Sequence, residues 1–169
     1  MPLILLILFA CTLIGCYGES AKERLPAIDD KKSSLIQAFS VAGKSSDTKS
    51  VVTIDAYSNS RSFDLTWQLL TVNARGEIYL SYNDQFESSL DLFILSNCDV
   101  FPSCSSQKNF STQCTYSTQN RLICDSNNQL ALVLDNFITE LPMQVYFILR
   151  ACDSDSKQCQ TSAIAVEFR

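Results

Sequence analysis

The chain has 169 residues, a net charge of −5 and no histidine. This length suits one ordinary domain plus a tail, and the absence of imidazole excludes histidine-dependent triads and metal sites. Basic side chains in the second part, such as Arg61, Arg75, Arg121 and Arg150, are scattered singly. Nucleic-acid binding needs clustered positive charge, so we expect no nucleic-acid partner.

The first segment has the character of an export signal. Residues 2–15 are uncharged and almost wholly apolar, but they are fewer than the roughly 20 residues that a bilayer-spanning helix needs. The segment ends in Leu13-Ile14-Gly15-Cys16, which resembles the lipobox of bacterial lipoproteins, although no Lys or Arg precedes it. The resemblance implies that residues 1–15 are a signal peptide and that Cys16 carries acyl chains. Tyr17 in place of Asp after the cysteine implies sorting to the outer membrane, facing the periplasm or the surface.

Two alternatives to lipidation remain open. A secretory signal cleaved after Gly18 would release a soluble secreted protein, and a retained apolar segment would anchor the chain directly. The triplet Asn109-Phe110-Ser111 fits the N-glycosylation sequon, which matters only if the source is eukaryotic.

Residues 16–48 are polar apart from one apolar stretch at 35–39, and they show no sustained period. The lipobox resemblance implies that Cys16, the first of them, is lipidated, and the composition of the rest predicts a flexible tether with room for one short helix.

The remainder, residues 49–169, has the period of β-strands. Phe63, Leu65, Trp67 and Leu69 alternate with polar residues, as in a half-buried strand. Similar runs recur with turn signals between them. The seven predicted strands are residues 51–57, 63–69, 77–82, 90–95, 129–134, 143–152 and 162–168. They predict an all-β domain formed by a single antiparallel sandwich, with residues 112–118 and 121–124 pairing in a Cys-rich hairpin insertion.

Six of the eight cysteines lie in this domain. An exported protein matures in an oxidising compartment, so we expect three disulfides. Many connectivities are possible, but the spacing favours consecutive pairs, and it is wider than that of typical zinc ligands. The expected pairs are Cys98 with Cys104, Cys114 with Cys124, and Cys152 with Cys159.

A second resemblance rests on the C-terminal part. Leu141 and Pro142, followed by Tyr146 and a strand that ends in Arg-Ala, resemble the F-strand region of fibronectin type III domains, and residues 162–168 resemble the last strand. Trp67 resembles the core tryptophan of that family. The resemblance implies an immunoglobulin-like sandwich with Trp67 in the core. It also implies a core ring for Tyr146, whose hydroxyl bonds back to upstream backbone.

No motif identifies an active site. The chain has no Gly-x-Ser-x-Gly elbow, and Asp153 and Asp155 lack the Gly and Glu of a calcium loop. We therefore expect no catalytic residue, metal or cofactor. The predicted function is a membrane-anchored binding or structural module, an accessory subunit that docks to another cell-envelope protein. The alternatives are a secreted or surface adhesin that binds carbohydrate and, least favoured, a hydrolase with a carboxylate pair.

Overall fold

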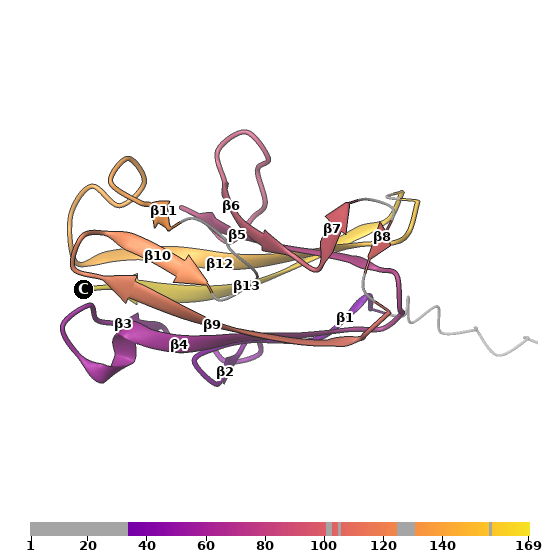
Figure 1. Cartoon of the computed structure of the whole chain (residues 1–169), viewed down its shortest axis with the longest axis horizontal. Helices are drawn as coiled ribbons and strands as arrows, with labels where there is room; N and C mark the ends of the chain where they lie inside the picture. The colour runs from indigo at the N-terminus through magenta and orange to yellow at the C-terminus, as the bar shows by residue number, and fades with distance from the viewer. Residues whose placement is uncertain (1–33, 101–102, 105, 125–130, 156) are drawn as a thin grey trace, which may run out of the picture. The chain divides into compact units, whose positions relative to one another are not determined.

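Strands form almost all the regular structure of the computed structural model, which describes residues 34–100, 103–104, 106–124, 131–155 and 157–169 (Figure 1). Within them, the one helical segment is the 3₁₀ turn Asn59–Arg61. In this part of the chain no helix is long and apolar enough to cross a bilayer. The predicted signal peptide, Cys16 and the first part of the predicted tether lie outside the described residues.

Two sheets make the sandwich. Sheet A is antiparallel, and its strands in spatial order are β11 (Leu132–Val133), β10 (Arg121–Cys124), β9 (Asn109–Ser117), β4 (Ser62–Leu69), β1 (Ile36–Val41) and β2 (Lys44–Ser45). The strands of sheet B are β3 (Val52–Ile54), β13 (Cys159–Phe168), β12 (Met143–Cys152), β5 (Arg75–Ser81) and β6 (Leu92–Ser96). A separate small hairpin pairs β7 (Cys98–Val100) with β8 (Ser103–Cys104).

The prediction of an all-β sandwich is confirmed, but the expectation of a fully antiparallel one is wrong in one pair. β3 runs parallel to β13. The chain leaves sheet A after β2 and joins the edge of sheet B in the direction of β13. Its partner is therefore the last strand of the chain instead of a hairpin neighbour.

The core lies between the inward faces of the two sheets. Along β4, the alternating residues Phe63, Leu65, Trp67 and Leu69 are buried, as their period predicts. The Phe63 ring meets Phe147 of β12 edge-on, with ring centroids 5.8 Å apart, which joins sheet A to sheet B. Burial of each such side chain contributes about 1.5–3 kcal/mol, so this layer is the main stabilising element of the fold.

The flexible-tether prediction is wrong from residue 34 onward. Ile36–Val41 forms β1, a strand that pairs with β4 and buries Phe39 and Val41. A register shift between Ile36 and Ala38 interrupts the alternation. The alternation of apolar and polar residues is therefore too short to predict a strand from the sequence. β1 is stabilised by pairing with β4, which is distant in the sequence.

All seven predicted strands correspond to strands of the structure, with shorter bounds at residues 51–57 and 129–134; positions 129 and 130 are outside the described residues. The predicted hairpin is confirmed as β9 and β10.

The three predicted disulfides are confirmed. Cys98–Cys104, Cys114–Cys124 and Cys152–Cys159 are each bonded, and in each the two cysteines face one another across an antiparallel pair of strands. Each bridge therefore ties one hairpin.

Candidate functional site

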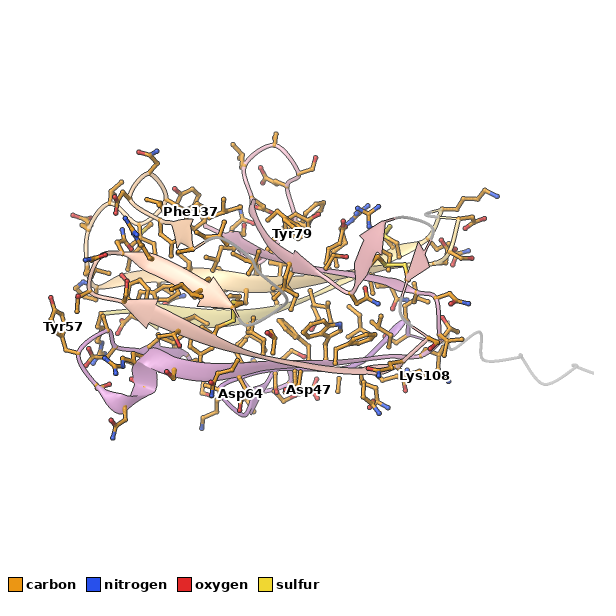
Figure 2. All side chains as sticks on the ribbon, viewed as in Figure 1. Asp47, Tyr57, Asp64, Tyr79, Lys108 and Phe137 are labelled. Atoms are coloured by element: carbon orange, nitrogen blue, oxygen red, sulfur yellow. A yellow bond between two sulfur atoms is a disulfide. The ribbon has the colours of Figure 1, made fainter. Side chains whose placement is uncertain are left out.

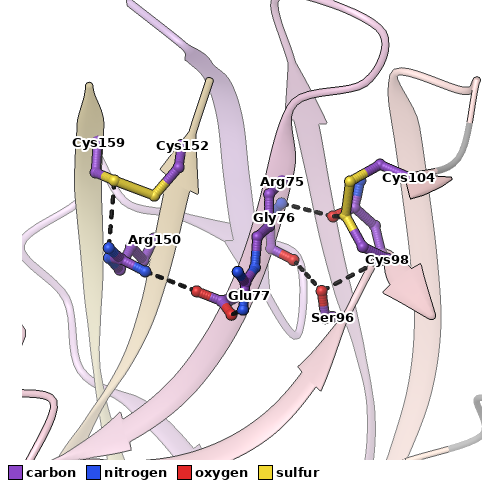
Figure 3. Close-up of polar contacts among 10 residues, drawn as sticks. Arg75, Gly76, Glu77, Ser96, Cys98, Cys104, Arg150, Cys152 and Cys159 are labelled. Atoms are coloured by element: carbon purple, nitrogen blue, oxygen red, sulfur yellow. Dashed lines mark hydrogen bonds and ion pairs between the residues drawn. A yellow bond between two sulfur atoms is a disulfide. The ribbon is translucent and has the colours of Figure 1, made fainter. Parts of the chain in front are cut away.

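Glu77 is a buried carboxylate on the outward face of sheet B, with 2% of its surface exposed. Arg75 precedes it by two residues on β5 and pairs with its Oε1 atom. Arg150 lies directly opposite on β12, with Nη1 2.8 Å from Glu77 Oε2 (Figure 3). A buried carboxylate is costly unless it is paired, and the two guanidinium groups supply that pairing. Because both oxygens are occupied, Glu77 positions two arginines and does not present an open base.

Tyr79 continues the same face of β5 and begins an aromatic cluster. Its ring centroid lies 4.7 Å from that of Phe86 and 5.6 Å from that of Phe93. The Arg150 guanidinium lies 5.0 Å from the centre of the Phe86 ring, a cation–π contact. Burial, together with the charge and hydrogen bond of Glu77, raises the pKa of Tyr79 to about 12 against the opposing charges of Arg150 and Arg75.

The loop between β5 and β6 completes this surface (Figure 2). Within the loop, the Glu87 amide donates to Asp91 Oδ2 at 2.7 Å, and the Leu90 amide donates to the Glu87 carbonyl at 2.9 Å. Leu90 is 60% exposed, and Phe93, three residues later on edge strand β6, is 44% exposed. We name Tyr79, Phe86, Leu90 and Phe93 the apolar patch. It presents aromatic and aliphatic surface beside the fixed cation of Arg150.

A pocket of about 260 Å³ lies at one end of the sandwich, where three loops converge. Its floor is buried and its rim is exposed and mixed in polarity. It is lined by Ala56, Tyr57, Tyr116, Thr118, Asn120, Ile138, Thr139, Glu140 and Leu141. We name it the loop-end pocket.

Tyr146 does not have its predicted role. Val145 and Phe147 face the core, so Tyr146 faces outward on β12, and its hydroxyl accepts from Gln144 Nε2 at 3.3 Å. Tyr146 is one position out of phase with the inward-facing residues of β12, and a one-residue shift reverses the face of a strand residue. Its side chain lines a shallow groove over Ala163 and Ala165.

Trp67 is a core residue as predicted, 5% exposed and stacked on Phe110 with ring centroids 5.2 Å apart. Gly76 on β5 allows this close packing, since an added Cβ would lie 3.1 Å from Trp67 Nε1. Among the described residues, the buried tyrosine is Tyr116. It packs against Phe168, with ring centroids 4.5 Å apart, and donates from its hydroxyl to Asn120 Oδ1 at 3.0 Å.

The sequence alone does not indicate that the residues of the apolar patch, of the Glu77 ion pairs or of the loop-end pocket form a site. Glu77 and Arg150 are separated by 73 positions, so their pairing depends on strand order. For Tyr57 the sequence gives a weak indication of an exposed aromatic residue, because Tyr57 follows Asp55 in a stretch typical of turns and precedes a polar run.

Within the described residues, no group of three or more His, Cys, Asp or Glu side chains is arranged to hold a metal ion. No protein-family model matches the chain, and no curated protein matches it significantly.

Proposed function

We propose that this protein is a non-catalytic lipoprotein of the cell envelope, an accessory subunit that docks to a protein partner through the apolar patch. The observation that carries the proposal is the exposure of Phe93 beside the packed rings of Tyr79 and Phe86, with the exposed Leu90 three residues before Phe93 in the sequence. Singly exposed apolar residues are ordinary on protein surfaces, whereas contiguous ones mark interaction sites.

The composition of the patch favours a protein as the occupant. Tyr, Phe and Arg are enriched at the centres of protein interfaces, where they bury large areas at small entropic cost. Here the aromatic rings contact one another and Arg150 is held by Glu77, so little freedom remains to be lost on binding. Phe93 of the patch lies on β6, which is an edge strand of sheet B among the described residues.

Lipidation of Cys16 and sorting to the outer membrane are part of the proposal. The lipobox-like Leu13-Ile14-Gly15-Cys16 and the following Tyr17 support them. A relationship to fibronectin type III domains is likewise proposed. The two-sheet sandwich and the buried Trp67 support it, whereas the outward Tyr146 departs from it.

The patch is tested by crosslinking in cells that produce the full-length protein, followed by affinity purification. We expect a defined envelope protein to be recovered with the wild type and to be lost with Phe93→Ser or Leu90→Ser. Ile123→Ser is the matched control, since Ile123 is 42% exposed on the opposite sheet. Equal recovery with all variants would contradict the role of the patch, as would sedimentation of the wild type as a stable homodimer.

The anchor is tested separately by mass spectrometry of the mature N-terminus. An acylated Cys16 is the expected result. An unmodified chain that begins at Glu19 would contradict the lipid anchor and support a secreted protein. Because the two readouts are independent, failure of one leaves the other interpretable.

A further inference from the structure

The loop-end pocket gathers side chains that lie far apart in the sequence. Ala56 and Tyr57 follow β3, Thr118 and Asn120 belong to the turn between β9 and β10, and residues 138–141 precede β12. Its floor is formed by buried side chains, and Tyr57, 81% exposed, projects from this end of the sandwich (Figure 2).

Asn120 holds the pocket in shape. It adopts a left-handed conformation with φ of 53°, which Asn tolerates better than most residues. Its Oδ1 atom accepts from the Tyr116 hydroxyl at 3.0 Å, and its Nδ2 atom donates to the Ile138 carbonyl at 2.8 Å. The amide of Tyr57 is fixed by a 2.8 Å bond to Asp55 Oδ1. Asn120 therefore ties two of the three loops together, and the backbone of the third loop is fixed locally at Tyr57.

The lining defines the chemistry of a ligand. Tyr57 and Leu141 offer apolar surface, and Thr118, Thr139 and Glu140 offer hydroxyl and carboxylate groups at an exposed rim. The lining contains no Lys or Arg, and Glu140 is negative, which disfavours an anion. Tyr116 is 1% exposed and committed to Phe168 and Asn120, so Tyr57 is a single aromatic platform and the pocket lacks a cage for an ammonium group.

A neutral molecule with one apolar face and several hydroxyls satisfies these conditions. The volume of about 260 Å³ is just below the range of about 300–1,000 Å³ that is usual for drug-sized ligands, which suits a single ring. A pyranose sugar has this size and this amphipathic character.

The pocket and the first described residues of the chain lie at opposite ends of β13. The Leu35 amide donates to Gln160 Oε1 at 2.6 Å at the start of β13, whereas the Ala56 amide donates to the Arg169 carbonyl just beyond its end. The ten residues of β13 separate these ends by about 30 Å. The pocket thus lies at the end remote from the point where the chain enters the sandwich.

We infer that the loop-end pocket binds one neutral pyranose ring of a glycan, with the apolar face of the sugar stacked on Tyr57 and its hydroxyls bonded to the rim residues Thr139 and Glu140. This site lies outside the apolar patch and adds a second binding activity to the proposed one.

The test is a titration of the full-length protein with methyl glucoside, methyl galactoside, methyl mannoside and N-acetylglucosamine, followed by two-dimensional NMR. We expect at least one sugar to shift the amide signals of residues 56–57, 118–120 and 138–141. Tyr57→Ala should weaken its affinity at least about fivefold, and Tyr57→Phe should stay within about twofold of the wild type. Tyr146→Ala, at a tyrosine outside the pocket, is the control and should leave affinity unchanged.

Three results would overturn the inference. They are the absence of shifts with every sugar, shifts confined to residues outside the pocket, and unchanged affinity in Tyr57→Ala. Shifts of the pocket signals by tetramethylammonium but by no sugar would assign the site to a cation instead. The amide spectrum of each variant without sugar reports whether it is folded, so loss of binding is separable from loss of structure.

Discussion

Glu77 takes part in two ion pairs on the outward face of sheet B, one with Arg75 and one with Arg150. Its carboxylate is almost fully buried, while the side chains of Arg75 and Arg150 remain 35% and 27% exposed. Removing the carboxylate would leave two like charges close together, although each retains some contact with water.

We therefore expect Glu77→Gln to lower the free energy of unfolding by about 2–3 kcal/mol. The measurement is urea denaturation followed by tryptophan fluorescence. Glu167→Gln is the matched control, because Glu167 pairs with Arg169 at an exposed site and should cost less than about 1 kcal/mol. Similar losses in the two variants would show that burial does not strengthen the Glu77 network.

Tyr79 predicts a stability change at alkaline pH. Its pKa is raised from 10.0 to about 12, so the folded state favours the neutral phenol. The resulting stabilisation is complete below pH 10 and is lost as pH rises through 12. We expect the tyrosinate absorbance of the folded wild type to contain a component near pH 12 that is missing in Tyr79→Phe. The variant should also lose less stability than the wild type over this interval, and identical titrations would contradict the assignment.

At the scale of elements, β1 is the first strand of the sandwich in the described part of the chain. It pairs with β4 along five registered positions and buries Phe39 and Val41. A chain that starts at residue 49, the boundary predicted from the sequence, would lack β1, expose the edge of β4 and lose the buried side chains of Phe39 and Val41 from the core.

We expect a truncated protein starting at residue 34 to fold and one starting at residue 49 to remain unfolded or to aggregate. Circular dichroism and thermal unfolding distinguish the two. Phe39→Ala in the full-length chain is an independent check, with an expected loss of about 3–5 kcal/mol. A cooperative transition in the shorter fragment would restore the tether interpretation for residues 34–48.

The elements that the sequence predicts well are those whose pattern is local. The alternation of apolar and polar residues from Phe63 to Leu69 is visible in the sequence because β4 has one face in the core along its whole length. The consecutive cysteine pairs follow from short loops closed by hairpins. β1 escapes prediction because a register shift breaks its period, and Tyr146 because the facing of a strand residue depends on a phase of one position. Glu77, Arg150 and the loop-end pocket require strand order, which no local pattern contains.

At the scale of the whole described domain, no disulfide joins sheet A to sheet B. Cys114–Cys124 lies within sheet A, Cys152–Cys159 within sheet B, and Cys98–Cys104 within the small hairpin. The two layers are held together by side-chain packing, including the ring contacts of Phe63 with Phe147 and of Tyr116 with Phe168. The crosslinks therefore restrain hairpins, and the core determines how the sheets associate.

The order of these crosslinks also bears on biogenesis. The six cysteines of the domain bond in three consecutive pairs along the chain, so an oxidase that joins thiols in the order in which they would leave a translocation channel would produce the native set directly. No bridge must wait for a later segment, and none needs to be reopened by an isomerase. If the protein is exported as proposed, its oxidation can thus proceed hairpin by hairpin before the two layers pack together.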